Sequence, residues 1–429
     1  MKKWIIIGNK ELCQNHSSHI AEIIESTEDP IYYDVDSLLR WNKQTNLKNI
    51  SEIYTATRNN LIEGILFIVL NREVTAVSLA LRDIRTKAYY LPEYLDRSHN
   101  NLKELKNALV FVNLNKPRLN YFEVHLTDNC NLNCKGCLHF CNIEKGITLI
   151  NYDNYLSDLL RMKELFWGVE TIKLLGGEPL LNKDLWKFVE ITRRVFPDSY
   201  LRILTNGLLL PKIDGKLTAT MNKLYVDFDI SMYKPTTLEE DQIISKLNEA
   251  GVKHNYKSNK SIKYFYKQLM INPVNNRLRS YKNCLDAKNG HTLRDGTLSL
   301  CPLAPLIYKL NNKYGLNYPT NNTNNIYEDI DGWELLERLN KPIDLCCYCS
   351  PHPKFFKWEQ GGQKLAKLED WIIPKSDLKW LEFQPQYLLI RIEGQIRDIL
   401  WGLLKFQYIY RCAKIIYKHI FPIQGNLIN

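Results

Sequence analysis

Several features that would place this chain in a common class of protein are missing from its sequence. No stretch reaches the roughly 18 uninterrupted apolar residues that a membrane-spanning helix needs, so a soluble, cytoplasmic protein is expected. The apolar run at residues 4–7 is too short for a signal peptide, and we expect it to form a first β-strand. The turn that follows, at residues 8–11, lacks the G-x-G-x-x-G pattern of dinucleotide-binding folds. Neither a membrane span nor a dinucleotide site is therefore predicted.

The positive charge of the chain is not concentrated in one region. Lys and Arg number 57 against 47 Asp and Glu, which gives a formal net charge of +10. The basic residues are scattered, and no recognisable nucleic-acid-binding module accompanies the mixed tyrosines and lysines of residues 253–267. We therefore predict no nucleic-acid partner.

The eleven cysteines are not dispersed as a disulfide framework would require. Nine of them lie in two groups, and only Cys13 and Cys412 lie far from either group. This distribution favours metal ligation in a reducing compartment.

The first group has the spacing Cys-x3-Cys-x2-Cys and consists of Cys130, Cys134 and Cys137. Three thiolates can converge on one iron–sulfur cluster and leave a coordination position free of protein, where a ligand can bind. A zinc knuckle or a buried group of thiols is the alternative. A zinc site usually closes with four protein ligands, commonly as paired Cys-x2-Cys units.

A second motif, Gly176-Gly177-Glu178-Pro179, follows an apolar strand at residues 169–175. Thr205-Asn206-Gly207 and Asp229-x-Ser231 follow the next two predicted strands, at 201–204 and 223–230. Together with the cysteine spacing, these motifs resemble the radical S-adenosylmethionine (SAM) superfamily.

The resemblance implies cofactors and contacts. Cys130, Cys134 and Cys137 would hold a [4Fe–4S] cluster that binds SAM at its open iron. The segment Gly176, Gly177, Glu178 and Pro179 would receive the methionine part of SAM, with Glu178 as the acceptor for its ammonium group. Thr205, Asn206 and Ser231 match further positions near SAM. The superfamily usually has an aromatic residue before the third cysteine, but this chain has Gly136 there. Phe140 is the candidate that could supply a ring instead.

Length and strand–helix alternation predict an α/β protein of several domains, because 429 residues exceed one ordinary domain. The resemblance implies a partial (β/α)6 barrel whose chemistry lies at the C-terminal ends of the strands. The expected divisions are a small Rossmann-like α/β domain (1–100), a connector (101–118), the radical SAM core (119–275), a cysteine-rich extension (276–360) and a helical C-terminal tail (361–429).

Alternating strand residues suggest a polar barrel interior. Glu123, His125 and Thr127 share one face of the first barrel strand. By the same parity, the interior also receives side chains from three further strands: Lys173, Arg202, Asp227 and Asp229. These groups either bind a polar substrate or pair with one another as an internal network.

The second cysteine group resembles the shortened SPASM extension called Twitch. Its spacing is Cys284-x11-Gly296-x4-Cys301, followed by Cys346 and Cys349, and a β-hairpin with Asp-Gly at its turn is expected at 293–302. The resemblance implies a second, auxiliary [4Fe–4S] cluster on Cys284, Cys301, Cys346 and Cys349. A zinc ribbon is the alternative. Cys347 is then spare, and Cys141 is expected to be a small buried apolar residue.

The sequence therefore predicts a radical SAM enzyme that cleaves SAM reductively and abstracts hydrogen from a polar substrate, such as a carbohydrate or nucleotide sugar. A peptide-modifying maturase and a non-catalytic iron–sulfur or zinc binding module are the alternatives. The resemblance implies an electron donor such as flavodoxin or ferredoxin, and no catalytic side chain is assigned. The basic, aromatic-rich tail at 387–421 is expected to dock on the protein itself rather than on a membrane surface.

Overall fold

The protein is described here from a computed structural model, which covers residues 2–8, 29–35, 43–69, 71–82, 84–91, 109–143, 148–256, 260–287, 290–361 and 366–374, with the single positions 13, 20, 24 and 377. Most of the predicted helix at 18–25 and the whole predicted tail at 387–421 lie outside the described residues.

The N-terminal part is a five-stranded sheet with the order β2-β1-β3-β4-β5. Its strands are β1 (Lys3–Gly8), β2 (Ile31–Asp34), β3 (Ile62–Ile68), β4 (Lys87–Tyr90) and β5 (Val110–Phe111), and its helices are α3 (Lys43–Arg58) and α4 (Asn71–Ala80). The first four strands pair in parallel and β5 pairs antiparallel. The predicted α/β sheet is thus present. Helix α3 was not predicted. Strand β5 lies within the segment expected to be a connector, but it belongs to this sheet.

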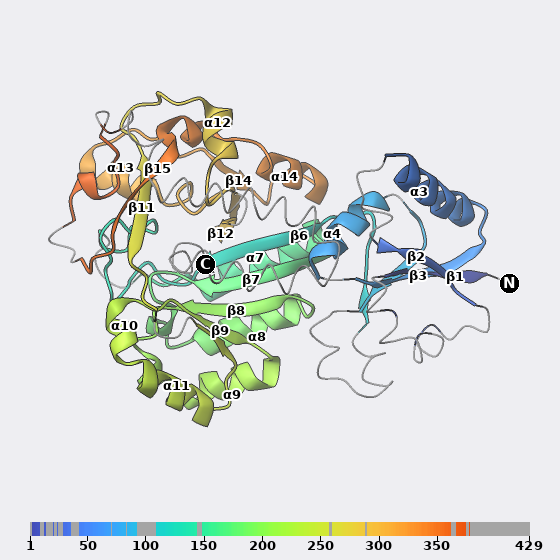
Figure 1. Ribbon diagram of the computed structural model, residues 1–429, viewed down its shortest axis with the longest axis horizontal. Helices are drawn as coiled ribbons and strands as arrows, with labels where there is room; N and C mark the ends of the chain where they lie inside the picture. Colours follow the sequence, from blue (N-terminus) through green and yellow to red (C-terminus); the bar gives the residue numbers. More distant parts are fainter. Residues whose placement is uncertain are drawn as a thin grey trace, which may run out of the picture.

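The main sheet has eight strands in the order β10-β9-β8-β7-β6-β12-β13-β14. They are β6 (Arg118–His125), β7 (Gly168–Leu175), β8 (Tyr200–Thr205), β9 (Asp227–Ile230), β10 (His254–Asn255), β12 (Thr292–Arg294), β13 (Thr297–Ser299) and β14 (Thr323–Asn325). All pairings from β10 to β12 are parallel, and the last two are antiparallel. The N-terminal sheet lies beyond the ends at which β6 and β7 begin (Figure 1).

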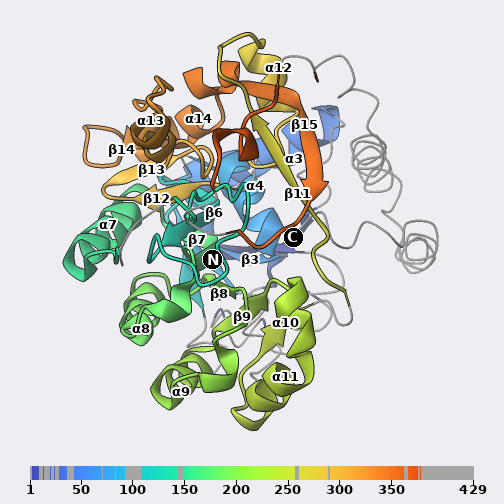
Figure 2. The same ribbon diagram turned by 90° about the vertical axis from the view of Figure 1, so that its left-hand side faces the viewer.

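Helices cover one face of the main sheet. They are α7 (Tyr152–Leu165), α8 (Leu185–Val195), α9 (Gly215–Leu224), α10 (Lys234–Leu238) and α11 (Glu240–Glu249). In the end-on view, α7, α8, α9 and α11 form an arc outside the strands (Figure 2). Alternate strand residues such as Phe122, Val124 and Phe228 are fully buried in the core beneath them. This face is apolar, so the polar residues between them point to the other, inner face.

The sheet is open, as a partial barrel is, but its sixth parallel strand does not come from the expected core at 119–275. The sixth strand within residues 119–275, β11 (Tyr264–Leu269), leaves the sheet and pairs antiparallel with β15 (Cys349–Lys357). Strand β12 from the cysteine-rich extension takes the place beside β6 instead. Leu293 and Leu298 of the extension belong to the same core as the barrel strands, so this segment completes the main sheet.

The predicted hairpin is present. Strands β12 and β13 pair directly, and both turn residues have positive φ, 46° at Asp295 and 74° at Gly296. Two central residues with positive φ are what a tight type I′ hairpin requires. The remaining helices of the extension are α12 (Arg277–Lys282), α13 (Tyr308–Tyr314) and α14 (Gly332–Leu339), with the 3₁₀ turns η3 (Asp344–Tyr348) and η5 (Leu368–Asp370).

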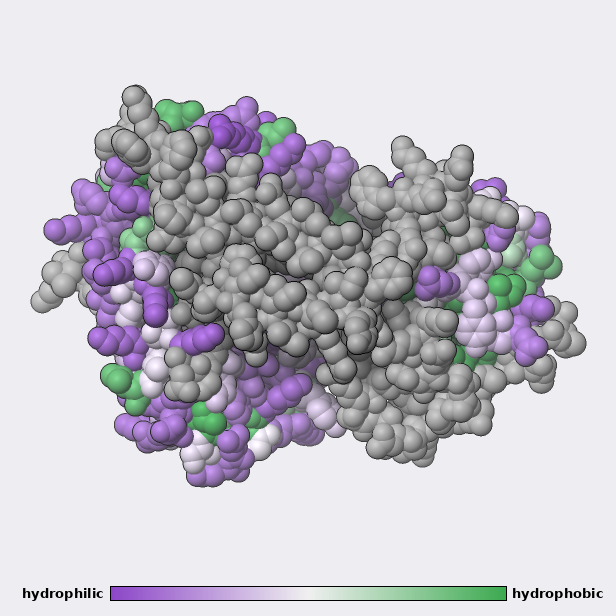
Figure 3. Space-filling model, viewed as in Figure 1, coloured by the Kyte–Doolittle hydropathy of each residue, from purple (hydrophilic) through white to green (hydrophobic). Residues whose placement is uncertain are grey.

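No helix in the described part of the chain is long and apolar enough to cross a membrane. On the face shown in Figure 3, the described residues are mainly hydrophilic, with small scattered hydrophobic patches.

Candidate metal and cofactor site

The three-cysteine loop follows β6 directly and is built on unusual backbone geometry. Asn133, Gly136 and Phe140 all have positive φ, at 47°, 65° and 55°. Repeated left-handed residues turn the chain sharply, which lets thiols three and four positions apart share one small volume. The thiol of Cys134 is buried, and those of Cys130 and Cys137 are half-buried.

A segment more than two hundred residues away clamps this loop. The indole Nε1 of Trp358 lies 3.1 Å from Cys134 Sγ, and that of Trp371 donates to the Cys137 carbonyl at 2.8 Å. Backbone bonds from Lys135 N to Glu359 O (3.0 Å) and from Gly361 N to Asn133 O (2.7 Å) hold the two segments side by side. The sequence carries no signal for these contacts, because neither tryptophan belongs to a motif.

Gly136, which stands where an aromatic residue was expected, has no room for a side chain. A Cβ there would lie 2.7 Å from Phe356 Cζ and 2.7 Å from the Asp370 carbonyl oxygen. The ring of Phe356 in β15 thus occupies the space beside the loop. Phe140 is fully buried in a separate core and packs against Trp371, with ring centroids 5.9 Å apart. Phe356 rather than Phe140 therefore brings an aromatic ring to this position.

The thiols of the loop have pKa values shifted from the usual value of a cysteine. Burial raises the pKa of Cys130 to about 11 and raises the pKa of Cys134 still further. A hydrogen bond from Cys141 is the main cause that lowers the pKa of Cys137, to about 5. Buried thiolates need a cationic partner, and bound metal supplies one. The donor set and its burial therefore fit a metal centre.

The two motif glycines lie against the chain just before the cysteine loop. A Cβ on Gly176 would lie 2.4 Å from the Thr127 carbonyl oxygen, and one on Gly177 would lie 2.0 Å from that of Asn129. The close approach allows Gly177 N and Glu178 N to donate to those same carbonyls, at 2.7 and 2.8 Å. Glycine is needed here because the two backbones touch. Pro179 is buried and begins the 3₁₀ turn η1 (Pro179–Leu181) that follows.

The carboxylate of Glu178 is fully enclosed and holds two loops together. Its Oε1 accepts bonds from Thr205 Oγ1 (2.7 Å) and Leu180 N (3.1 Å), and its Oε2 accepts one from Asn206 N (2.8 Å). Burial raises the pKa of Glu178 to about 7, against these hydrogen bonds, which lower it. The role predicted for Glu178 as the ammonium acceptor stays a prediction. Its hydrogen bonds also link the Gly-Gly-Glu-Pro turn to the loop after β8.

Glu178→Gln is expected to weaken both folding and SAM binding, because the new amide NH2 must face a backbone or hydroxyl donor. Leaving such a buried donor unpaired costs about 1–3 kcal/mol. We expect a loss of this size in the free energy of unfolding by urea, and SAM affinity lowered by about tenfold for each 1.4 kcal/mol. Glu164→Gln is the control, since that side chain is 65% exposed. A folded Glu178→Gln protein that binds SAM like the wild type would contradict the assignment.

Asn206 connects the loop after β8 to the cysteines. Its Nδ2 lies 3.6 Å from Cys130 Sγ and donates to Asn131 Oδ1 at 2.7 Å, while its carbonyl accepts from Thr236 Oγ1 at 2.6 Å. Ser231 N donates to the Thr205 carbonyl at 2.9 Å. The residues predicted near SAM on separate strands therefore do meet at the C-terminal ends of β6, β7, β8 and β9.

An ion cluster that the sequence did not reveal fixes the start of the cysteine loop. Asp128 accepts two bonds from Arg294, at 2.7 and 2.8 Å, and Lys309 Nζ lies 3.0 Å away. Burial acts to raise the pKa of Asp128, but Arg294 and Lys309 outweigh it and lower that pKa to about 2. The extension is thus bonded to the core beside the cysteines.

Charged side chains line the inner face of the sheet, as the strand parity predicted. Asp229 is shared by Lys173 at 3.2 Å and Arg202 at 3.4 Å, and all three are partly accessible. Asp227 accepts from Tyr200 Oη at 2.7 Å and lies 3.5 Å from Lys253. Two cations on one carboxylate leave a net positive charge there. These residues therefore form the internal network that was one of the two alternatives, and their binding of a substrate stays a prediction.

The four cysteines of the second group also lie near one another. The charges of Cys284, Cys301 and Cys346 all contribute to raising the pKa of Cys349, after burial, which is the largest cause. Cys284 follows α12, Cys301 follows β13, Cys346 lies in η3 and Cys349 begins β15. Cys347 is half-buried, and its carbonyl accepts from Asn275 N at 3.1 Å.

Among the described residues, no three cysteine sulfurs lie within 4.8 Å of one another. The choice between an iron–sulfur cluster and a zinc ribbon at the second cysteine group stays a prediction.

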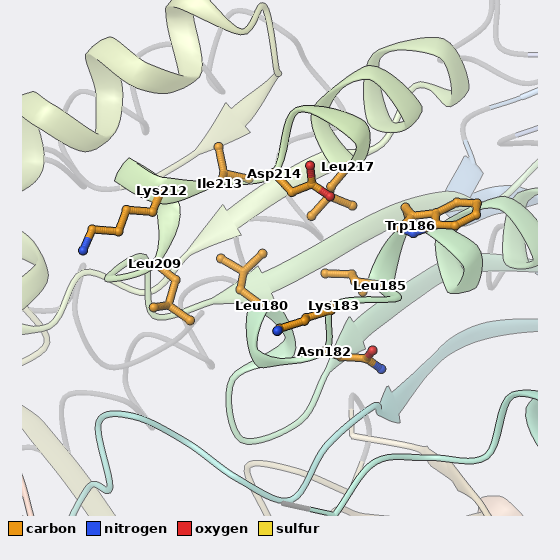
Figure 4. A pocket seen from close by; sticks show the side chains of 10 residues that line it. All are labelled: Leu180, Asn182, Lys183, Leu185, Trp186, Leu209, Lys212, Ile213, Asp214 and Leu217. Carbon is orange, nitrogen blue, oxygen red and sulfur yellow. The ribbon is translucent and has the colours of Figure 1, made fainter.

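A separate pocket of about 350 Å³ lies outside this site, between the turns that follow β7 and β8. Figure 4 shows its lining side chains, which include Leu180 of η1, Leu209 before η2 (Leu210–Lys212), Leu185 and Trp186 of α8, and Leu217 of α9. Lys216 Nζ lies 3.3 Å from the centroid of the Trp186 ring. Apart from the neighbouring Leu180, the lining shares nothing with the motifs, so the cofactor residues do not face it.

A protein-family model matches the middle part of the chain. Residues 124–231 match the family model described as the radical SAM superfamily. The chain carries a radical SAM domain. This superfamily binds a [4Fe–4S] cluster and SAM, and the matched segment contains every cysteine and motif residue predicted for that pair.

The similar curated proteins match only part of this chain. The chain is 35% identical over 114 residues to molybdenum cofactor biosynthesis protein 1 of Dictyostelium discoideum, covering 25% of this chain and 18% of that protein. It is 33% identical over 120 residues to GTP 3′,8-cyclase of Sulfurovum sp., covering 26% and 34%. With the same enzyme of Clostridium botulinum the identity is 29% over 167 residues, covering 37% and 48%. The chain thus spans less than half the length of each of these relatives.

Similar solved structures include BtrN in complex with AdoMet and 2-DOIA, at 16% identity, 60% of this chain, 100% of that chain and a TM-score of 0.34. Another is anSMEcpe with bound AdoMet, at 12% identity, 66% and 100% coverage and a TM-score of 0.36.

Proposed function

We propose that this protein is a radical SAM enzyme that abstracts hydrogen from a polar substrate, a carbohydrate or a nucleotide sugar. One observation carries the proposal: Asn206 joins the cysteine loop at Cys130 to the carboxylate of Glu178. Residues from three strand ends thus surround one volume, as a bound cluster and SAM require. When bound, the reduced cluster and SAM supply a 5′-deoxyadenosyl radical.

The protein's own part is to hold and orient these groups. Cys130, Cys134 and Cys137 would ligate the cluster, and the Trp358 indole beside Cys134 would remain as a donor to its thiolate. The glycine pair fixes the turn that meets the methionine part. The Phe356 ring, packed over Gly136, is our candidate for an apolar contact with the adenine.

The inner face of the sheet supports a polar substrate. Lys173 and Arg202 share one carboxylate and remain partly accessible, so they can bind hydroxyl or phosphate oxygens. The GTP 3′,8-cyclases are named for a nucleotide substrate, which agrees in chemistry with a nucleotide sugar. A one-electron donor such as flavodoxin or ferredoxin is part of this proposal.

We also propose a second, auxiliary [4Fe–4S] cluster on Cys284, Cys301, Cys346 and Cys349. The mutual electrostatic influence of the four thiols supports a shared metal centre. The likeness to a Twitch extension rests on the cysteine spacing. Such a cluster would accept one electron from the substrate radical, which is thereby oxidised to the product.

Anaerobically reconstituted protein is expected to form 5′-deoxyadenosine slowly with SAM and dithionite alone. Addition of the correct substrate should accelerate this by roughly tenfold or more, since substrate binding positions the reacting atoms. A panel of nucleotide sugars, aminosugars, GTP and short peptides would be compared, with deuterated substrate to trace hydrogen transfer into 5′-deoxyadenosine.

Acceleration by a sugar compound, with deuterium transfer, supports the proposal. Acceleration by peptides alone would point to a maturase instead. Iron-loaded protein that forms no 5′-deoxyadenosine under any condition would refute the enzymatic function.

A further inference from the structure

Three side chains on the inner face of the sheet form a compact group that no motif includes. They are Glu123 and His125 of β6 and His139, which lies just after the cysteine loop. One ligand atom from each lies within 4.8 Å of the other two, and no other such group of His, Cys, Asp or Glu occurs among the described residues. Glu123 is 7% exposed and His125 is 3% exposed. The group is therefore buried rather than part of a solvated surface.

One atom of this group is left without a hydrogen bond. His125 Nε2 is enclosed and has no hydrogen-bond partner in the described part of the chain. It lies 3.5 Å from Glu123 Oε1. Buried polar atoms are almost always satisfied, so an orphaned imidazole nitrogen beside a carboxylate points to a ligand that completes the group.

The surrounding contacts orient the other donor atoms. His139 Nδ1 lies 3.3 Å from the Gly176 carbonyl oxygen, which can only accept, so this contact places the proton on Nδ1 and leaves Nε2 with a lone pair. Glu123 Oε2 accepts from Tyr121 Oη at 2.8 Å, and Oε1 accepts from Thr292 Oγ1 at 3.2 Å. Histidines bonded to carbonyls and carboxylates held by hydroxyls are the usual supports of metal ligands.

We propose that Glu123, His125 and His139 bind one divalent transition-metal ion of the zinc type inside the barrel. Zinc bonds to nitrogen and oxygen of about 2.0–2.2 Å place tetrahedral ligand atoms about 3.3–3.5 Å apart, close to the distance between His125 and Glu123. The two imidazole rings, with centroids 4.4 Å apart and planes inclined by 55°, need only side-chain rotation to converge. Three protein ligands leave a coordination position for water or a substrate oxygen.

The charged groups around the site carry a net positive charge, which a bound metal ion must overcome through its bonds to the Glu123 carboxylate and the two imidazoles. Lys173, on the next strand, is paired with Asp229. Arg294 and Lys309, near His125, both contact Asp128. Among the described residues, the Glu123 carboxylate forms an ion pair with no Lys or Arg, and its one such partner is His125. A bound metal ion would therefore supply its counter-charge.

Zinc binding by the full-length protein tests the site. Protein with both cysteine groups reconstituted, as judged by iron and sulfide content, would be titrated with zinc chloride alone against a chromophoric chelator, with zinc and iron counted by mass spectrometry. About one zinc ion per chain is expected beside the full iron content. His125→Ala and Glu123→Gln should weaken zinc binding on the order of 100-fold without loss of iron. Glu123→Gln keeps the side-chain shape and guards against a folding defect.

His254→Ala is the matched control, because this half-buried histidine lies in the same sheet but outside the group. X-ray absorption at the zinc edge should show only nitrogen and oxygen ligands at about 2.0–2.2 Å. Sulfur ligands at about 2.3 Å would place the zinc in a cysteine site and overturn the proposal. So would unchanged zinc affinity in both variants, or no zinc retained by the wild type. None of these results depends on SAM cleavage, so the two proposals can fail separately.

Discussion

Replacing Cys130, Cys134 and Cys137 together by alanine is expected to abolish 5′-deoxyadenosine formation and to halve the iron content. Two four-iron clusters account for about eight iron atoms per chain, and about four should remain. The reason is that the Cys130 thiol lies 3.6 Å from Asn206 Nδ2, and Asn206 N also donates to Glu178, where SAM is proposed to bind. Iron and sulfide assays, together with chromatography of the SAM cleavage products, measure both effects.

Cys13→Ala serves as the control, since this half-buried thiol lies in the N-terminal part of the chain. It should keep all of the iron and all of the activity. Retention of SAM cleavage by the triple variant would contradict the cofactor site, and stoichiometric zinc without iron in the wild type would contradict both clusters.

The second large effect is expected from a pair of adjacent cysteines. Cys346→Ala should lose the auxiliary cluster and leave about four iron atoms, whereas Cys347→Ala should keep about eight. The charge of Cys346 helps to raise the pKa values of Cys284, Cys301 and Cys349, so Cys346 faces the other three thiols. The charge of Cys347 contributes to the raised pKa of its direct neighbour, Cys346.

Iron content and the electron paramagnetic resonance spectra of the reduced proteins distinguish these variants. Cys346→Ala should still release 5′-deoxyadenosine without substrate, because the three-cysteine loop does not use Cys346. Product formation from the true substrate should fail, since the auxiliary cluster is proposed to accept the second electron. Equal iron loss from both variants, or loss from Cys347→Ala alone, would show that the ligand was assigned wrongly.

The extension and the core are not independent in this fold. Strand β12 joins the main sheet beside β6, and Trp358 and Trp371 contact the cysteine loop. Cys346 lies in η3, before β15, whereas Trp358 follows β15. The pairing of β11 with β15 therefore holds the Trp358 contact in place when the auxiliary cluster is lost.

Local chemistry made a large part of this protein predictable from its sequence. The cysteine spacing and the Gly-Gly-Glu-Pro motif pointed to the radical SAM domain that the family comparison shows. Alternation along β6 predicted that Glu123 and His125 lie on its polar face, opposite the buried Phe122 and Val124. The Asp295-Gly296 pair predicted a hairpin, because few other residues accept positive φ at both turn positions. Each of these signals depends on neighbours within a few residues.

Contacts between distant segments were decided only by the tertiary structure. The sequence shows that Gly136 departs from its family, but only packing shows that Phe356, from another sheet, fills its space. The departure of β11 from the main sheet, the clamp by Trp358 and the meeting of His139 with Glu123 and His125 are of the same kind. Periodicity sets which face of a strand is polar, but not which strand or loop will lie opposite it. That choice depends on the packing of side chains from segments that are not neighbours in the sequence, for which one sequence carries no local signal.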